Sequence, residues 1–242
     1  MTMKTIGLIG GMSWESTAAY YRLLNEEARA RLGGLHSAQI LLYSVDFEPI
    51  EQLQHQGDWE GAARILTKAA LRLQDGGADF FLICTNTMHR VAPLVEAAVR
   101  IPLLHIADPT AESLLAKGVQ TVGLLGTAFT MEQEFYRGRL EQRHGLEVVT
   151  PSRADRRIVH DIIYQELCQG KIRQAAKSAY LRIIGELAGR GAEAVILGCT
   201  EIGLLVKQED SAVPLYDTTA LHAVRAMELA LTAKPGASAP SL

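Results

Sequence analysis

The chain has 242 residues, 48% of them hydrophobic and 21% charged, which suits an ordinary packed globule of one large domain or two small ones. The net charge of −3 and the pI near 6.2 provide no basic surface for nucleic acid or for membrane lipids. No apolar stretch reaches the ~18 residues of a membrane span and the N-terminus lacks a signal-peptide pattern, so we expect a cytoplasmic protein.

Apolar runs and helix-like periodicities alternate along the chain. We predict strands at residues 4–9, 39–45, 79–84, 102–106, 121–125, 147–149, 193–197 and 213–215. We predict helices at residues 14–32, 58–75, 89–99, 110–117, 131–144, 155–168, 172–189 and 218–231. An alternation of this kind is typical of parallel sheets with helices on both faces.

One segment of the chain occurs in two similar copies. Residues 77–87 read GADFFLICTNT and residues 191–201 read GAEAVILGCTE. Two further pairs recur in the same order, residues 5–10 with 121–126 and residues 101–103 with 213–215. Apolar strands followed by glycine look alike in any α/β protein, but three ordered matches at offsets of 112 to 116 residues favour an internal duplication.

The duplication predicts an α/β fold of two pseudo-symmetric half-domains, each a doubly wound parallel sheet, with the active site in the cleft between them. We place the first half-domain at residues 1–109 and the second at residues 110–217. The C-terminal helix, residues 218–234, is expected to pack back on the first half-domain.

The second copy of the repeated segment ends in Gly198-Cys199-Thr200-Glu201. A cysteine at a strand end beside glycine faces a cleft, and N–H groups of the following turn would lower the pKa of its thiol below ~8.5. A buried structural cysteine is the alternative. The pattern does not separate a nucleophile from a general base.

The first copy ends in the polar run Cys84-Thr85-Asn86-Thr87-Met88-His89. Asn86 and Thr87 could donate hydrogen bonds to a carboxylate beside a helix N-terminus, or simply cap that helix. For His89 we expect a solvated position in the first helical turn rather than a role as general acid or base.

Two loops follow glycine-containing strands. Residues 10–17, GGMSWEST, lack the spacing of a dinucleotide fingerprint and the lysine of a phosphate loop, so we expect a tight turn that presents Ser13 to a small anion. The loop that begins at Gly126 and Thr127 is the equivalent of this loop in the second copy of the repeat, so we expect Thr127 to face the same cleft from the other half. A turn followed by an N-cap would also explain both loops. Cys168 is expected in a structural or pocket-wall position.

Together these motifs resemble the aspartate/glutamate racemase family, which works without pyridoxal phosphate. The likeness rests on Gly10-Gly11-Met12-Ser13, Thr85-Asn86-Thr87 with His89, Gly126-Thr127 with Thr130-Met131, and Gly198-Cys199-Thr200-Glu201. The resemblance is strongest to the bacterial branch of broad-specificity amino-acid racemases. The resemblance implies substrate-binding roles for Met12, Ser13, Asn86, Thr87, Thr127, Thr130, Thr200 and Glu201. It also implies an amino-acid substrate, with Asp and Glu among the candidates, no cofactor or metal, and a homodimer.

The family mechanism places two cysteines on opposite faces of the substrate α-carbon, where one thiolate removes the proton and the other thiol delivers one. Here Cys199 occupies one of these positions, while Thr85 holds the other and Cys84 comes one residue early. A one-residue shift turns a strand side chain to the opposite face, so Cys84 is the less favoured catalytic residue. The resemblance therefore implies Cys199 as the thiol acid and base on one face and Thr85 on the other.

Family members specific for aspartate hold the distal carboxylate with an arginine and a lysine. No Lys or Arg occurs in residues 32–63, and Cys168 stands where the lysine would fall, so we expect a wider substrate range. Two alternatives remain open at this point. One is a related isomerase or decarboxylase of small dicarboxylates, similar to maleate isomerase, and the other is a catalytically weak amino-acid-binding protein.

Overall fold

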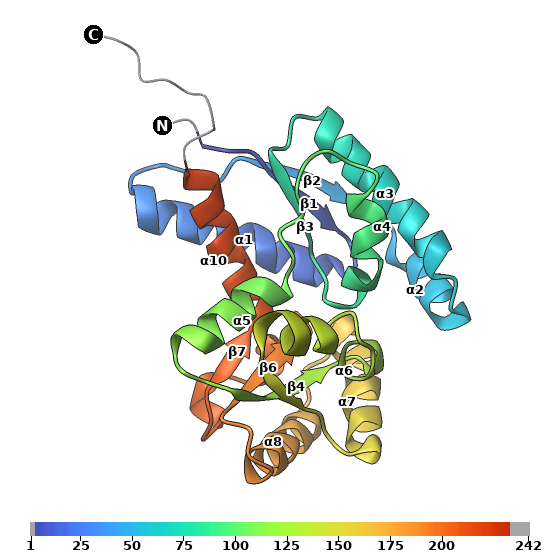
Figure 1. The fold of residues 1–242 in the computed structure, drawn as a ribbon, viewed down its shortest axis with the longest axis vertical. Coiled ribbons are helices and arrows are strands. Elements are labelled where there is room, and N and C mark those ends of the chain that lie inside the picture. Colours follow the sequence, from blue (N-terminus) through green and yellow to red (C-terminus); the bar gives the residue numbers. More distant parts are fainter. Residues whose placement is uncertain (1–2, 233–242) are drawn as a thin grey trace.

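The computed structural model describes residues 3–232 as two α/β halves that stack on each other (Figure 1). The strands are β1 Ile6–Gly10, β2 Ile40–Ser44, β3 Phe80–Ile83, β4 Thr121–Gly126, β5 Glu147–Val149, β6 Ala194–Gly198 and β7 Leu215–Asp217. The α-helices are α1 Trp14–Leu32, α2 Phe47–Gln56, α3 Trp59–Asp75, α4 Ala92–Glu96, α5 Ala107–Ala116, α6 Ala128–Glu132, α7 Arg153–Gln165, α8 Gln174–Gly189, α9 Ile202–Leu205 and α10 Thr218–Leu231. Short 3-10 or π turns are η1 Thr87–Val91, η2 Arg139–Arg143, η3 Leu167–Gln169 and η4 Gln208–Asp210.

Each half contains one parallel sheet, and the two sheets have the same strand order. The first runs β2-β1-β3, and a bridge from Phe81 to Leu103 adds the start of a fourth strand at its edge. The second runs β5-β4-β6-β7, with every pair parallel. The central strands β1, β3, β4 and β6 are buried along their lengths apart from Thr121, as expected for strands covered by helices on both faces. The predicted fold class of two related parallel-sheet halves is confirmed.

Several predicted elements differ in extent for local reasons. The strand expected at 102–106 shrinks to the Leu103 bridge, since Pro102 has no N–H to donate and the chain turns into α5. The helix expected at 89–99 begins as η1 and continues as α4, with Pro93 in the first turn of α4. The helix expected at 131–144 is broken after Glu132, where Gln133 adopts an extended backbone (φ −104°, ψ 149°), and helical structure resumes in η2, which Gly138 precedes with helical dihedral angles.

Helix α10 joins the two halves. It starts at the end of β7 in the second sheet, and Ala223, Ala226 and Met227 then pack in one apolar cluster with Tyr20 and Leu24 of α1. An ion pair of 3.2 Å between Arg31 of α1 and Glu228 of α10 closes the far end of this contact. Residues 233–234 of the helix predicted at 218–234 lie outside the described residues. Within residues 3–232, no helix has both the length and the apolar character needed to cross a membrane.

Candidate active site

A small pocket lies where the carboxyl ends of the central strands of both sheets meet. It is lined by Met12, Phe47, Gln54, Thr85, Asn86 and Thr87 of the first half and by Thr127, Ile163, Tyr164, Cys168, Gly198, Cys199 and Glu201 of the second. Its cavity volume of about 20 Å³ leaves room for about one water molecule. The structure therefore represents a closed form, in which the two halves meet over the site.

The structure brings Thr85 and Cys199 to this one pocket from opposite halves. Cys84 does not line it. The Cys84 side chain is fully buried in the apolar cluster that α1 and α10 build on the other side of the first sheet. The difference follows from the strand geometry, because neighbouring side chains at the end of β3 point to opposite faces.

Glu201 is the polar centre of the pocket. Its Oε2 accepts hydrogen bonds from the Cys199 thiol at 3.0 Å and the Thr200 hydroxyl at 2.6 Å. Its Oε1 accepts a 2.6 Å hydrogen bond from the Ser13 hydroxyl of the other half and lies 3.9 Å from Cys168 Sγ. Glu201 is only 2% exposed, so these donors supply what water would otherwise provide.

The pKa of the Cys199 thiol is raised well above its ordinary value, mainly by burial and next by the negative charge of Glu201. The expectation that turn N–H groups lower this pKa is therefore wrong for the closed form. Cys199 is 8% exposed, and desolvation outweighs the favourable dipoles of the turn. A thiolate at this position requires a base that takes the proton, and Glu201 is in contact with it.

Asn86 lines the pocket with one amide atom unused. Its Nδ2 donates to Thr218 Oγ1 at 3.1 Å, and Thr218 in turn donates to the Leu197 carbonyl at 3.0 Å. Since the Thr218 proton is committed to that carbonyl, Thr218 Oγ1 can only accept from Asn86, which fixes the orientation of the amide. Asn86 Oδ1 is then a buried acceptor without a partner. Thr218 engages one of the two Nδ2 hydrogens, and the expectation that the Asn86 side chain donates to a substrate carboxylate stays a prediction.

The remaining predicted residues fall into two groups. Met12, Thr87 and Thr127 line the pocket, and the Thr87 and Thr127 hydroxyls meet across the two halves at 3.0 Å. Ser13, Thr130 and Thr200 do not line the pocket, but each forms a hydrogen bond to a residue that does: Ser13 and Thr200 to Glu201, and Thr130 to Thr127. Ser13 caps α1 and Thr127 caps α6, so each loop has both the capping role and a position at the cleft. Gly11 makes the first loop possible, because it adopts a φ of 96° against Val45.

His89 is not solvated as expected. It is 1% exposed, and its ring nitrogens bind the Thr85 carbonyl at 2.8 Å and the Ile106 N–H at 3.2 Å. The prediction failed because η1 turns inward, under the connection between the halves, instead of lying on the surface.

Sequence reasoning missed the contribution of α2. Phe47 and Gln54 of this helix line the pocket, and Gln54 accepts a 3.2 Å hydrogen bond from Tyr164 of α7. The available signals were the N-cap Asp46 and the C-cap Gly57, which bound the ten-residue helix on both sides. No lysine, arginine or histidine is among the residues that line the pocket.

The comparisons with known proteins fit this geometry. The family model described as Asp/Glu/Hydantoin racemase matches residues 9–226. The chain belongs to this racemase family. It is therefore an isomerase of the class of racemases that work without pyridoxal phosphate.

Two solved structures resemble this racemase closely. A candidate Asp/Glu racemase from Yersinia pestis is 56% identical, with a TM-score of 0.89 over 95% of this chain and 100% of that one. PH1733, an aspartate racemase homologue from Pyrococcus horikoshii OT3, is 37% identical, with a TM-score of 0.82 over 94% of this chain and 99% of that one. The broad-specificity amino-acid racemase RacX of Bacillus subtilis is 20% identical over 89% of this chain and 93% of its own length.

Proposed function

We propose that this racemase moves the α-proton of a free amino acid between its two faces without a cofactor. The observation that carries the proposal is the contact between the Cys199 thiol and Glu201 in a pocket that Thr85 lines from the other half. A thiol that a carboxylate can deprotonate is a suitable acid and base for a carbon-bound proton.

Proton transfer begins with the thiol. Glu201 accepts the Cys199 proton, so the S–H bond breaks and an O–H bond forms. The thiolate then takes the α-proton of the substrate, so the C–H bond breaks and an S–H bond forms. The same steps in reverse return a proton to the same face. Inversion needs a proton from the opposite face, where Thr85 stands. A hydroxyl is a far poorer acid and base than a thiol, so transfer on the Thr85 face should be the slow step.

The polar groups favour one way of holding the substrate. Asn86 Oδ1 is a buried acceptor without a partner, which suits the α-ammonium group. The hydroxyls of Thr87 and Thr127 contact each other and can rotate to donate to the α-carboxylate, where charge builds up as the proton leaves. This arrangement places the α-carbon between the two halves.

The described residues that line the pocket include no cation for the end of the substrate side chain. Its distal wall consists of Phe47, Gln54, Ile163, Tyr164 and Cys168, which supply apolar surface and neutral hydrogen-bonding groups. We therefore propose a broad range of amino-acid substrates. Aspartate and glutamate, named in several relatives, would be bound here through neutral donors such as the Gln54 amide.

Replacement of single cysteines tests the proposal. In D₂O the wild-type chain should incorporate deuterium at the α-carbon of at least one amino acid, as measured by NMR. Cys199→Ser should reduce this exchange by roughly 10²-fold or more, because the base is lost. Cys84→Ser is the matched control and should retain most of the rate, since Cys84 lies in the α1–α10 cluster.

Two outcomes would contradict the proposal. Absence of exchange across a broad amino-acid panel would exclude the racemase reaction, and turnover of maleate or a malonate instead would indicate the related dicarboxylate chemistry. Equal loss of exchange in the folded Cys84→Ser and Cys199→Ser variants would overturn the assignment of Thr85, rather than Cys84, to the opposite face.

A further inference from the structure

A cluster of three histidines lies behind Thr85 and has no part in the proton transfers described above. His89, His105 and His222 are 1%, 6% and 0% exposed. The ring centroid of His89 lies 4.4 Å from that of His105 and 6.2 Å from that of His222. They come from η1, from the connection between the halves and from α10, and they meet beside the peptide that follows β3.

The hydrogen bonds fix the proton on His89. Its Nε2 receives the backbone N–H of Ile106, which can only donate, so Nε2 carries no proton. The proton therefore resides on Nδ1, which donates to the Thr85 carbonyl at 2.8 Å. His89 thus ties the Thr85–Asn86 peptide to Ile106, the residue that precedes α5 on the connection between the halves.

The two neighbouring histidines are neutral in the folded chain, because burial lowers the pKa of His222 to about 3 and that of His105 well below its ordinary value. His222 donates from Nε2 to the Leu104 carbonyl at 2.8 Å and accepts the Tyr20 hydroxyl at Nδ1, at 2.7 Å. His105 accepts the Ala107 N–H at Nδ1, at 3.2 Å. Within residues 3–232, no three His, Cys, Asp or Glu side chains are arranged to hold a metal ion. The hydrogen bonds of the three rings go to backbone groups and to the Tyr20 hydroxyl, so the cluster supports the chain around Thr85.

We infer that His89 is a positioning residue: its Nδ1–H bond to the Thr85 carbonyl holds the Thr85 face of the site in place for proton transfer, with His105 and His222 fixed behind it. The inference rests on the proposed function. The bonded carbonyl belongs to the peptide between Thr85 and Asn86, so this one contact orients both side chains toward the pocket. Cys199 lies in the other half and does not depend on it.

Two isosteric variants separate the two hydrogen bonds of His89. In His89→Asn the side-chain amide nitrogen takes the place of Nδ1 and can still donate to the Thr85 carbonyl. In His89→Gln the amide reaches the place of Nε2 instead, so the bond to Ile106 can be kept while the bond to Thr85 is lost. For the enantiomer whose α-proton faces Cys199, deuterium exchange with retention reports the Cys199 face. Inversion reports the Thr85 face.

The inference predicts an unequal effect. His89→Gln should slow inversion by about 10-fold or more, because misplacement of a reacting group by ~1 Å is costly, while exchange with retention stays within about 3-fold of wild type. His89→Asn should keep both rates within about 3-fold of wild type. The inference is overturned if both variants behave alike, or if His89→Gln lowers retention and inversion together.

A second readout does not depend on activity. The ¹⁵N spectrum of the His89 ring in the wild-type chain at neutral pH should show a proton on Nδ1 only, and the Asn86 amide should exchange with D₂O faster in His89→Gln than in His89→Asn. A proton on Nε2 alone, or a charged ring, would overturn the inference. If the wild-type chain exchanged no α-proton at all, the proposed function would fall, and these two NMR measurements would still decide whether His89 holds the Thr85 peptide.

Discussion

Glu201 carries a buried carboxylate that is satisfied by neutral donors. Ser13, Thr200 and Cys199 all donate to it. A buried charge is normally paired or fully hydrogen-bonded, and here hydroxyl and thiol groups do that work. The Glu201 carboxylate is thus in direct contact with the Cys199 thiol, in the position needed to accept its proton.

Replacement of Glu201 by glutamine tests this role. Glu201→Gln keeps the size of the side chain but cannot accept the Cys199 proton, so racemisation should fall by roughly 10²- to 10⁴-fold. Optical rotation of a single-enantiomer substrate measures the rate. Glu209→Gln, at an exposed position in η4, is the matched control and should be unchanged. A Glu201→Gln enzyme within a few-fold of wild type would show that another group deprotonates Cys199.

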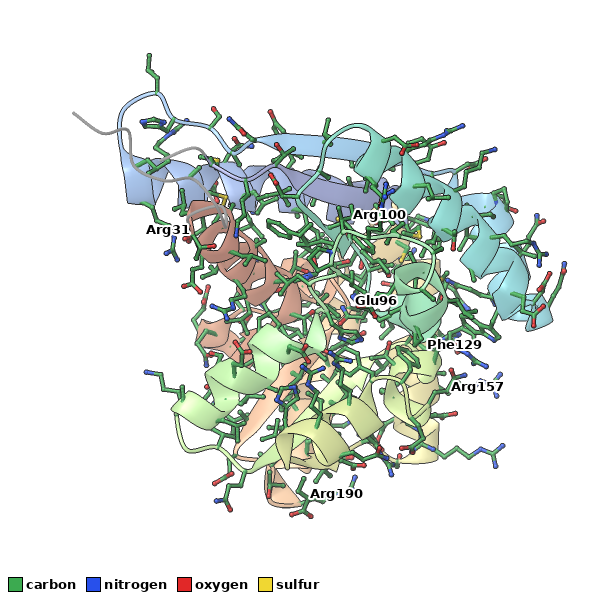
Figure 2. The ribbon with its side chains drawn as sticks, turned by 45° about the horizontal axis from the view of Figure 1, so that its top comes forward. Arg31, Glu96, Arg100, Phe129, Arg157 and Arg190 are labelled. Atoms are coloured by element: carbon green, nitrogen blue, oxygen red, sulfur yellow. The ribbon has the colours of Figure 1, made fainter. Side chains whose placement is uncertain are left out.

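At the scale of secondary-structure elements, an aromatic contact holds the two halves closed beside the pocket. Trp59 of α3 meets Phe129 of α6 edge to face, with ring centroids 5.2 Å apart, and Figure 2 shows Phe129 at the boundary between the halves. The Arg90 guanidinium lies 4.0 Å from the Trp59 ring centroid and also donates to Gln133 of the other half. A cavity of about 20 Å³ cannot admit an amino acid, so the pocket must widen before substrate binds, and we predict that this contact opens in that step.

Weakening the contact should make the pocket easier to enter. Trp59→Leu removes an edge-to-face pair and a cation–π contact, together about 2 kcal/mol, so the open population should rise by roughly 10- to 30-fold. Alkylation of Cys199 by iodoacetamide, followed by peptide mapping, should accelerate accordingly while Cys84 stays protected. Trp14→Leu is the control, since Trp14 is 68% exposed at the start of α1. An unchanged Cys199 rate in Trp59→Leu would locate the closing contact elsewhere.

The predictable part of the fold was the part with strong periodic signals. The repeated strands, the two parallel-sheet halves and the long helices followed from apolar runs and from the duplication. Helix α2 did not, because its ten residues contain few apolar positions, yet it supplies Phe47 and Gln54 to the pocket. The one-residue offset between Cys84 and Thr85 was legible in the alignment of the two copies. The inward turn of η1 and the burial of His89 depend on long-range packing that no local pattern encodes.

The sign of the Cys199 pKa shift was also beyond the sequence. The N–H dipoles of a turn at a strand end favour a thiolate, and the sequence around Cys199 predicts such a turn. Closure of the two halves removes water from the thiol and sets Glu201 against it, and both effects raise the pKa. The second effect depends on a side-chain geometry that the motif Gly-Cys-Thr-Glu alone does not specify.

For the molecule as a whole, the histidine cluster makes stability depend on pH. Burial lowers the pKa of His89 to about 4 and that of His222 to about 3, from an ordinary value of 6.5. Between pH 6.5 and pH 4 these histidines bind more protons in the unfolded chain than in the folded chain. The free energy of unfolding therefore falls as the pH drops through this range. His89 alone should account for a loss of about 3 kcal/mol over this range.

Urea unfolding at a series of pH values measures this dependence. The wild-type chain should lose stability steadily between pH 6.5 and pH 4.5, and His89→Asn should show a shallower slope, because asparagine does not titrate. The carboxylates are the same in both proteins, so the difference between the two slopes isolates His89. Equal slopes would mean that His89 is not held neutral in the folded chain.

The most general feature of the molecule is a two-fold architecture with different side chains at its two equivalent positions. The two sheets repeat one strand order and deliver equivalent loops to one pocket, but one loop brings Cys199 beside Glu201 and the other brings Thr85. The two enantiomers have equal free energy, so the enzyme cannot shift the equilibrium, and the asymmetry can appear only in rates. Substitution of Thr85 by cysteine should raise the slow rate, with a thiol now on both faces.

The α-proton exchange of separate L- and D-enantiomers in D₂O, followed by NMR at early times, tests this claim most directly. We expect one enantiomer to exchange at least about 10-fold faster than the other in the wild-type chain, and Thr85→Cys to narrow the difference. Equal initial exchange rates for the two enantiomers in the wild-type chain would contradict it.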